Sequence, residues 1–398
     1  MPDGVPDMSS ARRGSLAVNL HKLNSWCGIR VLAWHGDDLY GCRGYELVRL
    51  RARDLEPGSA SWQPVARFQP AWWRNLTARS KLTYRLVRDG FHALAIADGP
   101  KDGQVMIAAV PSGIITRDPD GGEFRITHKV LRGTRPLHIT AVPGGNIYWG
   151  EYFDNRARAE VHIYASGDLG QSWDIAHTFL ASGIRHVHNI IYDRFADCLW
   201  VLTGDEGAEC RVLRADRHLR NVEVVLLGNQ QARAVAAIPT RDALYLATDT
   251  PLERNHVLRL DRTGRIEVVD ELDSSSIFGC QTANALFFST MVEPSSVNTT
   301  REAHLTGSAD GYNWRAVASW QKDALPMHYF QYGNVILPDG ENTTNYLAAT
   351  TIAVKRADLV TTIWEVTTKG ERTNPSGQNR SEAPRAESRS SDAESRTS

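Results

Sequence analysis

Two histidines one residue apart, His186 and His188, stand at the start of an apolar segment near the middle of the chain. Because they alternate along the segment, both side chains should face the same side of a β-strand. Arginines precede comparable apolar segments at Arg135, Arg185 and Arg233. A histidine can act as a general base near neutral pH, and guanidinium groups bind carboxylates through paired hydrogen bonds. Together these residue types suit a ligand that carries a carboxylate.

Carboxylates occupy a recurring place, the end of a short apolar segment. Glu151 follows NIYWG, Asp205 and Glu206 follow CLWVLTG, Asp249 follows ALYLAT, and Glu293 follows ALFFSTMV. A glycoside hydrolase needs two carboxylates across the glycosidic bond, one of them kept protonated by its surroundings. A lyase that acts on uronic acids would instead use one of the two histidines as its base.

The elements that must position these residues are short β-strands. Segments such as VMIAAV, VEVVLLG and TIWEV are rich in Val, Ile, Leu and aromatic residues, and Gly, Asp, Asn and Pro separate them. The sequence shows no amphipathic helix longer than a turn or two. This pattern indicates an all-β protein.

The strands recur in units that an aspartate turn marks. Residues 166–173, SGDLGQSW, fit the pattern S-x-D-x-G-x-x-W, and residues 308–314, SADGYNW, fit it with one residue fewer. Weaker matches, in which a strand ends in Asp, occur at Asp54, Asp118, Asp216, Asp261 and Asp358. From each aspartate to the next, five of the six intervals lie between 45 and 50 residues, the length of a four-stranded propeller blade. We therefore predict a β-propeller of four-stranded blades, and seven marks favour seven blades over six.

These motifs and their spacing resemble the Asp-box (BNR-repeat) β-propellers, whose best-known members are the sialidases. The resemblance runs from about Cys27 to Val366. It implies that Asp168 and Asp310 are structural: the Asp and Ser side chains would hydrogen-bond the turn between the third and fourth strands of a blade, with the Trp packed beneath it. Because strand direction alternates, the starts of the inner strands and the ends of the second strands would then share the opposite face.

The same resemblance implies roles for several residues on that opposite face. Sialidases bind the acid group of sialic acid with three arginines, and their nucleophile is a tyrosine paired with a glutamate. By this resemblance Arg135, Arg185 and Arg233 would form the clamp, and Tyr152, beside Glu151, would be the nucleophile. The sequence around these arginines departs from the family's first-arginine motif.

We therefore expect a glycan-active enzyme, either a glycoside hydrolase or a uronate polysaccharide lyase, with its site on the face opposite the Asp boxes. The expected catalytic residues are Glu151, Tyr152, His186, His188, Asp205, Glu206, Asp249 and Glu293. The expected substrate-binding residues are Arg135, Arg185, Gln231, Arg233 and Asn255. The alternative is a non-catalytic propeller that binds a glycan or a protein through the same face.

Each of these residues also has a structural interpretation. A carboxylate at a strand end can cap a turn or pair with a neighbouring arginine, and an arginine can bridge two blades. His186 and His188 can be core histidines with satisfied hydrogen bonds, or can bind a metal together with a carboxylate or Gln231. Since two histidines alone are weak support for a metal, we predict neither a metal nor a cofactor.

Bulk properties restrict the class of protein. The 398 residues include 45 basic and 46 acidic ones, and this balance argues against nucleic acid or a membrane surface as partner. The five cysteines are an odd number without a CxxC pair, so we expect buried thiols. The chain has no apolar run that would serve as a signal peptide or a membrane span. We expect a cytoplasmic monomer whose partner is a carbohydrate.

The two ends of the chain differ from its middle in composition. No aromatic residue, Val, Leu, Ile or Met occurs from Lys369 onward. A segment of this composition has nothing to bury in a core. We expect residues 1–26 to form a partly disordered extension, residues 27–366 the propeller, and residues 367–398 a disordered polar tail.

Overall fold

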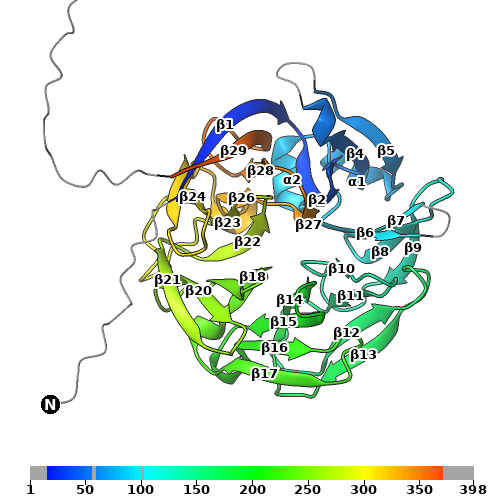
Figure 1. Cartoon of the computed structure of the whole chain (residues 1–398). Coiled ribbons are helices and arrows are strands. Elements are labelled where there is room, and N and C mark those ends of the chain that lie inside the picture. The colour runs from blue at the N-terminus through cyan, green and yellow to red at the C-terminus, as the bar shows by residue number, and fades with distance from the viewer. Residues whose placement is uncertain (1–15, 56–59, 100–102, 371–398) are drawn as a thin grey trace, which may run out of the picture.

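The computed structural model describes residues 16–55, 60–99 and 103–370. Their strands form seven sheets that follow one another around a central axis (Figure 1). The protein is a seven-bladed β-propeller, which confirms the predicted fold class. Residues 1–15 and 371–398 lie outside the described residues, so the disorder expected there stays a prediction.

Blades 1 to 4 each contain four antiparallel strands, which follow one another from the axis outward. Blade 1 contains β2 (Arg30–Gly36), β3 (Asp38–Arg43), β4 (Glu46–Arg51) and β5 (Gln63–Arg67). Blade 2 contains β6 (Ala93–Asp98), β7 (Gln104–Val110), β8 (Gly113–Arg117) and β9 (Arg125–Lys129). Blade 3 contains β10 (Thr140–Ala141), β11 (Ile147–Gly150), β12 (Val161–Ser166) and β13 (Asp174–Phe179). Blade 4 contains β14 (His186–Asp193), β15 (Cys198–Gly204), β16 (Arg211–Ala215) and β17 (Val222–Leu227).

Blades 5 to 7 complete the ring. Blade 5 contains β18 (Ala234–Pro239), β19 (Ala243–Thr248), β20 (Asn255–Asp261) and β21 (Ile266–Leu272). Blade 6 contains β22 (Ser276–Gln281), β23 (Leu286–Thr290), β24 (Glu302–Ser308) and β25 (Arg315–Gln321). Blade 7 contains β26 (Asn334–Ile336), β28 (Tyr346–Ile352), β29 (Val360–Gly370) and β1 (Leu16–Cys27). The short strand β27 (Asp339–Asn342) pairs in parallel with β2 at the inner edge of blade 1.

Both ends of the described chain contribute to blade 7. β1 pairs antiparallel with β29 along its whole length. Val18 of β1 and Val366 of β29 are buried in the same apolar cluster. The propeller therefore runs from Leu16 to Gly370, longer at both ends than the expected range of 27–366. The sequence signal for β1 is weak because most side chains of this outer strand are exposed or half-buried.

The two strong aspartate motifs lie where the repeat predicts. Asp168 lies between β12 and β13 and Asp310 between β24 and β25, in each case between the third and fourth strands of a blade. The Asp168 carboxylate accepts hydrogen bonds from the backbone N–H groups of Gln171 and Ser172, at 3.0 and 2.9 Å. The turn is therefore held by hydrogen bonds within the motif.

One of the weaker marks is placed differently. Asp54, Asp118 and Asp216 lie between third and fourth strands, and Asp261 is the last residue of the third strand of blade 5. Asp358 lies between β28 and β29, the second and third strands of blade 7, and so on the opposite face. The third and fourth strands of blade 7, β29 and β1, come from the two ends of the chain and share no hairpin. The predicted number of blades is right, but the prediction that Asp358 lies in a turn between third and fourth strands was wrong.

We call the face on which the inner strands begin the site face. Helices α1 (Trp72–Thr77) and α2 (Lys81–Val87) lie there, in the connection from blade 1 to blade 2. Helix α3 (Met327–Phe330) lies in the connection from blade 6 to blade 7. Arg85 of α2 donates a hydrogen bond to the carbonyl of Phe330 at 3.0 Å, so the two insertions are joined. The first insertion accounts for the long interval between the first two aspartate marks.

Apolar side chains fill the space between neighbouring blades; Ile107 of blade 2 and Trp149 of blade 3, for example, belong to one buried cluster. A cavity of about 420 Å³ follows the axis between the inner strands. Four of the five cysteines are buried and Cys27 is exposed. Among the described helices, none is long and apolar enough to cross a membrane. The expected location and monomeric state stay predictions.

Candidate functional site

The inner strand of blade 4 starts at the site face with two buried histidines, His186 and His188. His186 Nδ1 lies 3.0 Å from the backbone carbonyl of Phe153, and His188 Nδ1 lies 2.9 Å from that of Ala234. A carbonyl oxygen only accepts hydrogen bonds, so both Nδ1 atoms carry a hydrogen. In the neutral rings both Nε2 atoms are therefore lone-pair acceptors.

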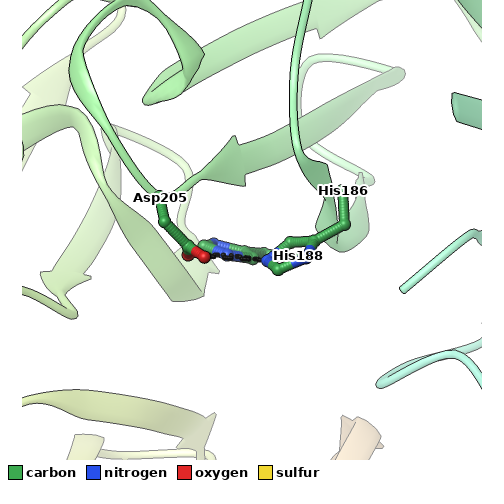
Figure 2. A group of neighbouring side chains, drawn as sticks. All are labelled: His186, His188 and Asp205. Carbon is green, nitrogen blue, oxygen red and sulfur yellow. Dashed lines mark hydrogen bonds and ion pairs between the residues drawn. The ribbon is translucent and has the colours of Figure 1, made fainter. Parts of the chain in front are cut away.

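Asp205 joins the two histidines from the end of the neighbouring strand. Its Oδ1 lies 3.1 Å from His188 Nε2 and 3.5 Å from His186 Nε2, and the two Nε2 atoms lie 3.1 Å apart (Figure 2). Within the described part of the chain, these three residues form the group whose ligand atoms are close enough to hold a metal ion. Burial alone would raise the pKa of Asp205, but the two imidazoles beside it, which become donors when protonated, hold that pKa well below its usual range. Burial lowers the pKa of His188.

Gly204 makes room for this group. It is the last residue of β15 and pairs with His186. A Cβ atom added at Gly204 would lie 2.5 Å from Cε1 of His188. Interiors are packed too closely to absorb such an overlap, so a side chain here would displace the ring. The glycine before Asp205 is thus a packing requirement that the sequence pattern did not reveal.

Arg185 and Arg233 flank Asp205. Arg185 places Nη1 3.1 Å from Asp205 Oδ2 and Nη2 2.7 Å from Asp154 Oδ1. Arg233 Nη2 lies 3.4 Å from Asp205 Oδ1 and 3.3 Å from Asp249 Oδ2. Both arginines therefore lie at the site, and each is paired with two carboxylates. Asp154 was not among the residues predicted for the site. Its position in the connection after β11, at the same face as the predicted carboxylates, was the sequence feature that could have identified it.

Two further expected residues, Asp249 and Tyr152, border the group. Burial, with a contribution from the charge of nearby Glu293, raises the pKa of Asp249 to about 7 against the opposing charge of Arg233. The Tyr152 ring centroid lies 4.3 Å from that of His186, and burial raises the pKa of the phenol to about 12. A carboxyl group that titrates near neutrality is suited to proton transfer.

Two expected carboxylates point elsewhere. Glu151 forms an ion pair with Arg132 and accepts a hydrogen bond from the backbone N–H of His162 at 2.8 Å. The side chain of Glu206 is 68 % exposed and lies 3.6 Å from Arg158. Both follow the predicted strands, but each forms an ion pair outside the histidine group.

Gln231 and Asn255 also have structural partners. The Gln231 amide donates to Glu253 Oε2 and lies within hydrogen-bond distance of His256 Nδ1, both at 2.9 Å. Asn255 is fully buried and holds the connection after β19, accepting from the backbone N–H of Thr250 at 2.8 Å. The expectation that they bind substrate has no support from these contacts.

The third expected arginine, Arg135, lies with Arg30 and His92 at the starts of blades 1 to 3. Arg30 begins β2, His92 directly precedes β6, and Arg135 precedes β10; β6 contacts both β2 and β10. Arg30 is 8 % exposed and donates to the carbonyls of Phe91 and His92 at 3.3 and 3.1 Å, while its Nε has no partner. In the described residues, the side chain of Arg135 has no hydrogen bond or ion pair.

We call Arg30, Arg88, His92 and Arg135 the arginine cluster. Burial, together with the charges of Arg30 and Arg88, lowers the pKa of Arg135 to about 10. Burial, followed by the charges of Arg135 and Arg30, holds the pKa of His92 well below its usual value. No carboxylate is among the groups that shift Arg135 most. The expected clamp of three arginines is therefore split: two are compensated beside Asp205, and the third belongs to this cluster.

Comparisons with known proteins add to the description of the fold. No protein-family model and no curated protein matches this chain. It is similar to the β-propeller domain of Myceliophteria thermophila Cps50 (Swd1), with a TM-score of 0.52 and 10% identity over 90% of this chain and 100% of that one. It is also similar to a catalytically inactive virginiamycin B lyase from Staphylococcus aureus, in a structure with quinupristin (TM-score 0.53, 12% identity, 88% and 99% covered). A chain of the mitotic checkpoint complex gives a TM-score of 0.51 at 11% identity, with 92% and 96% covered.

Identities this low show the propeller fold alone. The resemblance to the Asp-box family stays a prediction.

Proposed function

We propose that the protein is a glycan-active enzyme that acts on an acidic oligosaccharide bound across the site face. The arginine cluster is the observation that carries this proposal. Arg30 is buried and Arg135 is half-buried. Taking a guanidinium group out of water without a counter-ion costs on the order of several kcal/mol. A ligand carboxylate would supply the missing charge, and guanidinium groups bind carboxylates through two parallel hydrogen bonds.

The cluster offers hydrogen-bond donors. Arg30 Nη1 lies 3.4 Å from His92 Nδ1. Since a guanidinium group only donates, this Nδ1 accepts, and the hydrogen of neutral His92 is on Nε2. Arg30 Nε is thus a buried donor without a partner, and within the described residues no hydrogen bond is formed by His92 Nε2 or by the guanidinium of the half-buried Arg135. Such a set suits an anion and does not suit a cation.

The chemistry would take place on blades 4 and 5. Asp249, with a pKa of about 7, is the group on this face that is best suited to accept or donate a proton near neutral pH. The arginine cluster belongs to blades 1 to 3, whereas Asp249 follows β19 of blade 5. We therefore infer an oligosaccharide substrate, with its acidic unit at Arg135 and its scissile bond nearer to Asp249.

A non-catalytic propeller that binds the same ligand is the second candidate. The observation in its favour is burial: His186 is 5 % exposed and Asp249 6 % exposed. Binding without turnover is the outcome that would identify it.

The test uses the full chain with oligosaccharides that contain uronic or sialic acid and with neutral oligosaccharides of the same length. We expect binding of the acidic set alone, measured by calorimetry, and cleavage seen as new reducing ends. Ultraviolet absorbance of an unsaturated uronate would identify a lyase, and its absence a hydrolase. Arg135→Gln should weaken binding about tenfold or more, whereas Arg241→Gln, at an exposed arginine of the opposite face, should not. Equal binding of neutral oligosaccharides, or an unchanged Arg135→Gln variant, would overturn the proposal.

A further inference from the structure

The group of His186, His188 and Asp205 has an arrangement that hydrogen bonds within the protein do not explain. Its three converging atoms, two Nε2 and one Oδ1, are separated by 3.1, 3.1 and 3.5 Å. Both Nδ1 hydrogens are used by backbone carbonyls. With neutral rings, three lone pairs therefore face one another. One added proton would turn one of these repulsive lone-pair contacts into a hydrogen bond. A cation placed between the three atoms would make all three contacts favourable.

We propose that His186 Nε2, His188 Nε2 and Asp205 Oδ1 bind one divalent transition-metal ion, of the class of Mn²⁺, Fe²⁺ or Zn²⁺. Two imidazoles and one carboxylate on one side of an ion are a ligand set that these cations prefer over Mg²⁺ or Ca²⁺. The proposal does not depend on the glycan function, since it follows from the three ligands.

The spacing of the three atoms fits an ion of this size. For metal–ligand bonds of about 2.1 Å, adjacent ligand atoms lie roughly 3.0 Å apart in octahedral and 3.4 Å apart in tetrahedral coordination. The observed separations lie in or close to this range. Three protein ligands leave at least one position open for water or for a ligand oxygen.

The groups around the three ligands are those that orient a metal site. The carbonyls of Phe153 and Ala234 fix both imidazoles with Nε2 toward the centre. Arg185 binds Asp205 Oδ2 at 3.1 Å, which leaves Oδ1 directed at the histidines. Hydrogen bonds of this kind hold metal ligands in position in known sites, and their loss weakens metal binding.

The charges nearby are compatible with a bound cation. Arg185 and Arg233 contribute two positive charges, and Asp154, Asp205 and Asp249 contribute up to three negative ones. Arg233 approaches Asp205 Oδ1 only to 3.4 Å, longer than either contact of Arg185 with a carboxylate. A divalent ion would turn this part of the site face positive, so that it attracts an anionic ligand.

The experiment measures metal binding without substrate. Tag-free full-length protein is treated with a chelator, dialysed and titrated with MnCl₂, ZnCl₂ or CoCl₂ by calorimetry, and the retained metal is counted by mass spectrometry. We expect one ion per chain and a higher melting temperature with metal. Asp205→Asn and His188→Ala should each lower the affinity by at least about tenfold.

Two controls separate this site from other causes. His218→Ala, at an exposed histidine in the turn between β16 and β17, and Arg135→Gln should bind metal as the unaltered protein does. Melting curves without metal show whether a variant is folded, and Asp205→Asn, which keeps the shape of the side chain, serves if His188→Ala does not fold. No retained ion and no titration, or equal affinity in the Asp205→Asn variant, would overturn the inference. Because no sugar is present, failure here leaves the glycan proposal intact, and the converse also holds.

Discussion

Arg233 Nη2 lies 3.3 Å from Oδ2 of Asp249, yet burial raises the pKa of this carboxyl group to about 7. The ion pair is therefore too weak to offset the loss of hydration. Between about pH 4 and pH 7 the folded protein holds a proton that the unfolded chain releases. The stability contributed by this proton is fully present below about pH 4 and is lost as the pH rises through 7.

Asp249→Asn should remove the loss of stability that accompanies the rise in pH. We expect the variant to gain melting temperature relative to the unaltered protein at pH 8, and to gain little or nothing at pH 4, because Asn carries no charge at either pH. Scanning fluorimetry of chelator-treated protein across this range measures the difference. Equal gains at both pH values would show that Asp249 is not protonated in the fold.

Arg135→Gln should stabilise the protein while it weakens the binding of acidic ligands. The substitution removes a half-buried positive charge that has no partner in the described residues and lies near Arg30 and Arg88, and we expect about 1 kcal/mol of added stability. Urea unfolding measures it, with Arg241→Gln as the exposed control. A loss of stability in Arg135→Gln would mean that the guanidinium is compensated by the protein itself.

Asp168→Ala should cost about 1–2 kcal/mol of stability, because the carboxylate accepts hydrogen bonds from two backbone N–H groups of its turn. It lies on the face opposite His188 and should leave metal and glycan binding unchanged. Asp174→Ala, at an exposed residue just after the same turn, is the matched control and should change stability little. Chemical unfolding and calorimetry of both variants provide the comparison.

Val18→Asp should open the ring at blade 7. Val18 is 5 % exposed and packs with Val366, so a buried carboxylate there should cost about 3 kcal/mol or more. Leu16→Asp, two residues earlier on the same strand at an exposed position, should cost far less. If the two variants melt alike, β1 does not close the propeller.

The sequence alone could predict the repeat and the side of each strand. The Asp168 and Asp310 turns follow from local hydrogen bonding of Asp and Ser, which needs no distant partner. The two-residue period of a strand predicted that His186 and His188 lie together, and they do so although the pairing of β14 with β15 is irregular at His188. Local rules of this kind also placed Asp205 and Asp249 on the site face.

What local rules could not decide is which neighbour each charged side chain meets. Glu151 and Asp205 end equivalent strands, yet Glu151 pairs with Arg132 while Asp205 meets two histidines. Arg135 begins a blade as Arg233 does, but only Arg233 finds carboxylates. These outcomes depend on contacts between blades, whose residues lie tens of positions apart in the chain. The sequence by itself determined the propeller and the face on which these ionisable side chains lie, because repeats and strand periods are local. Only the tertiary structure decided which charges are compensated, because the partners come from different blades.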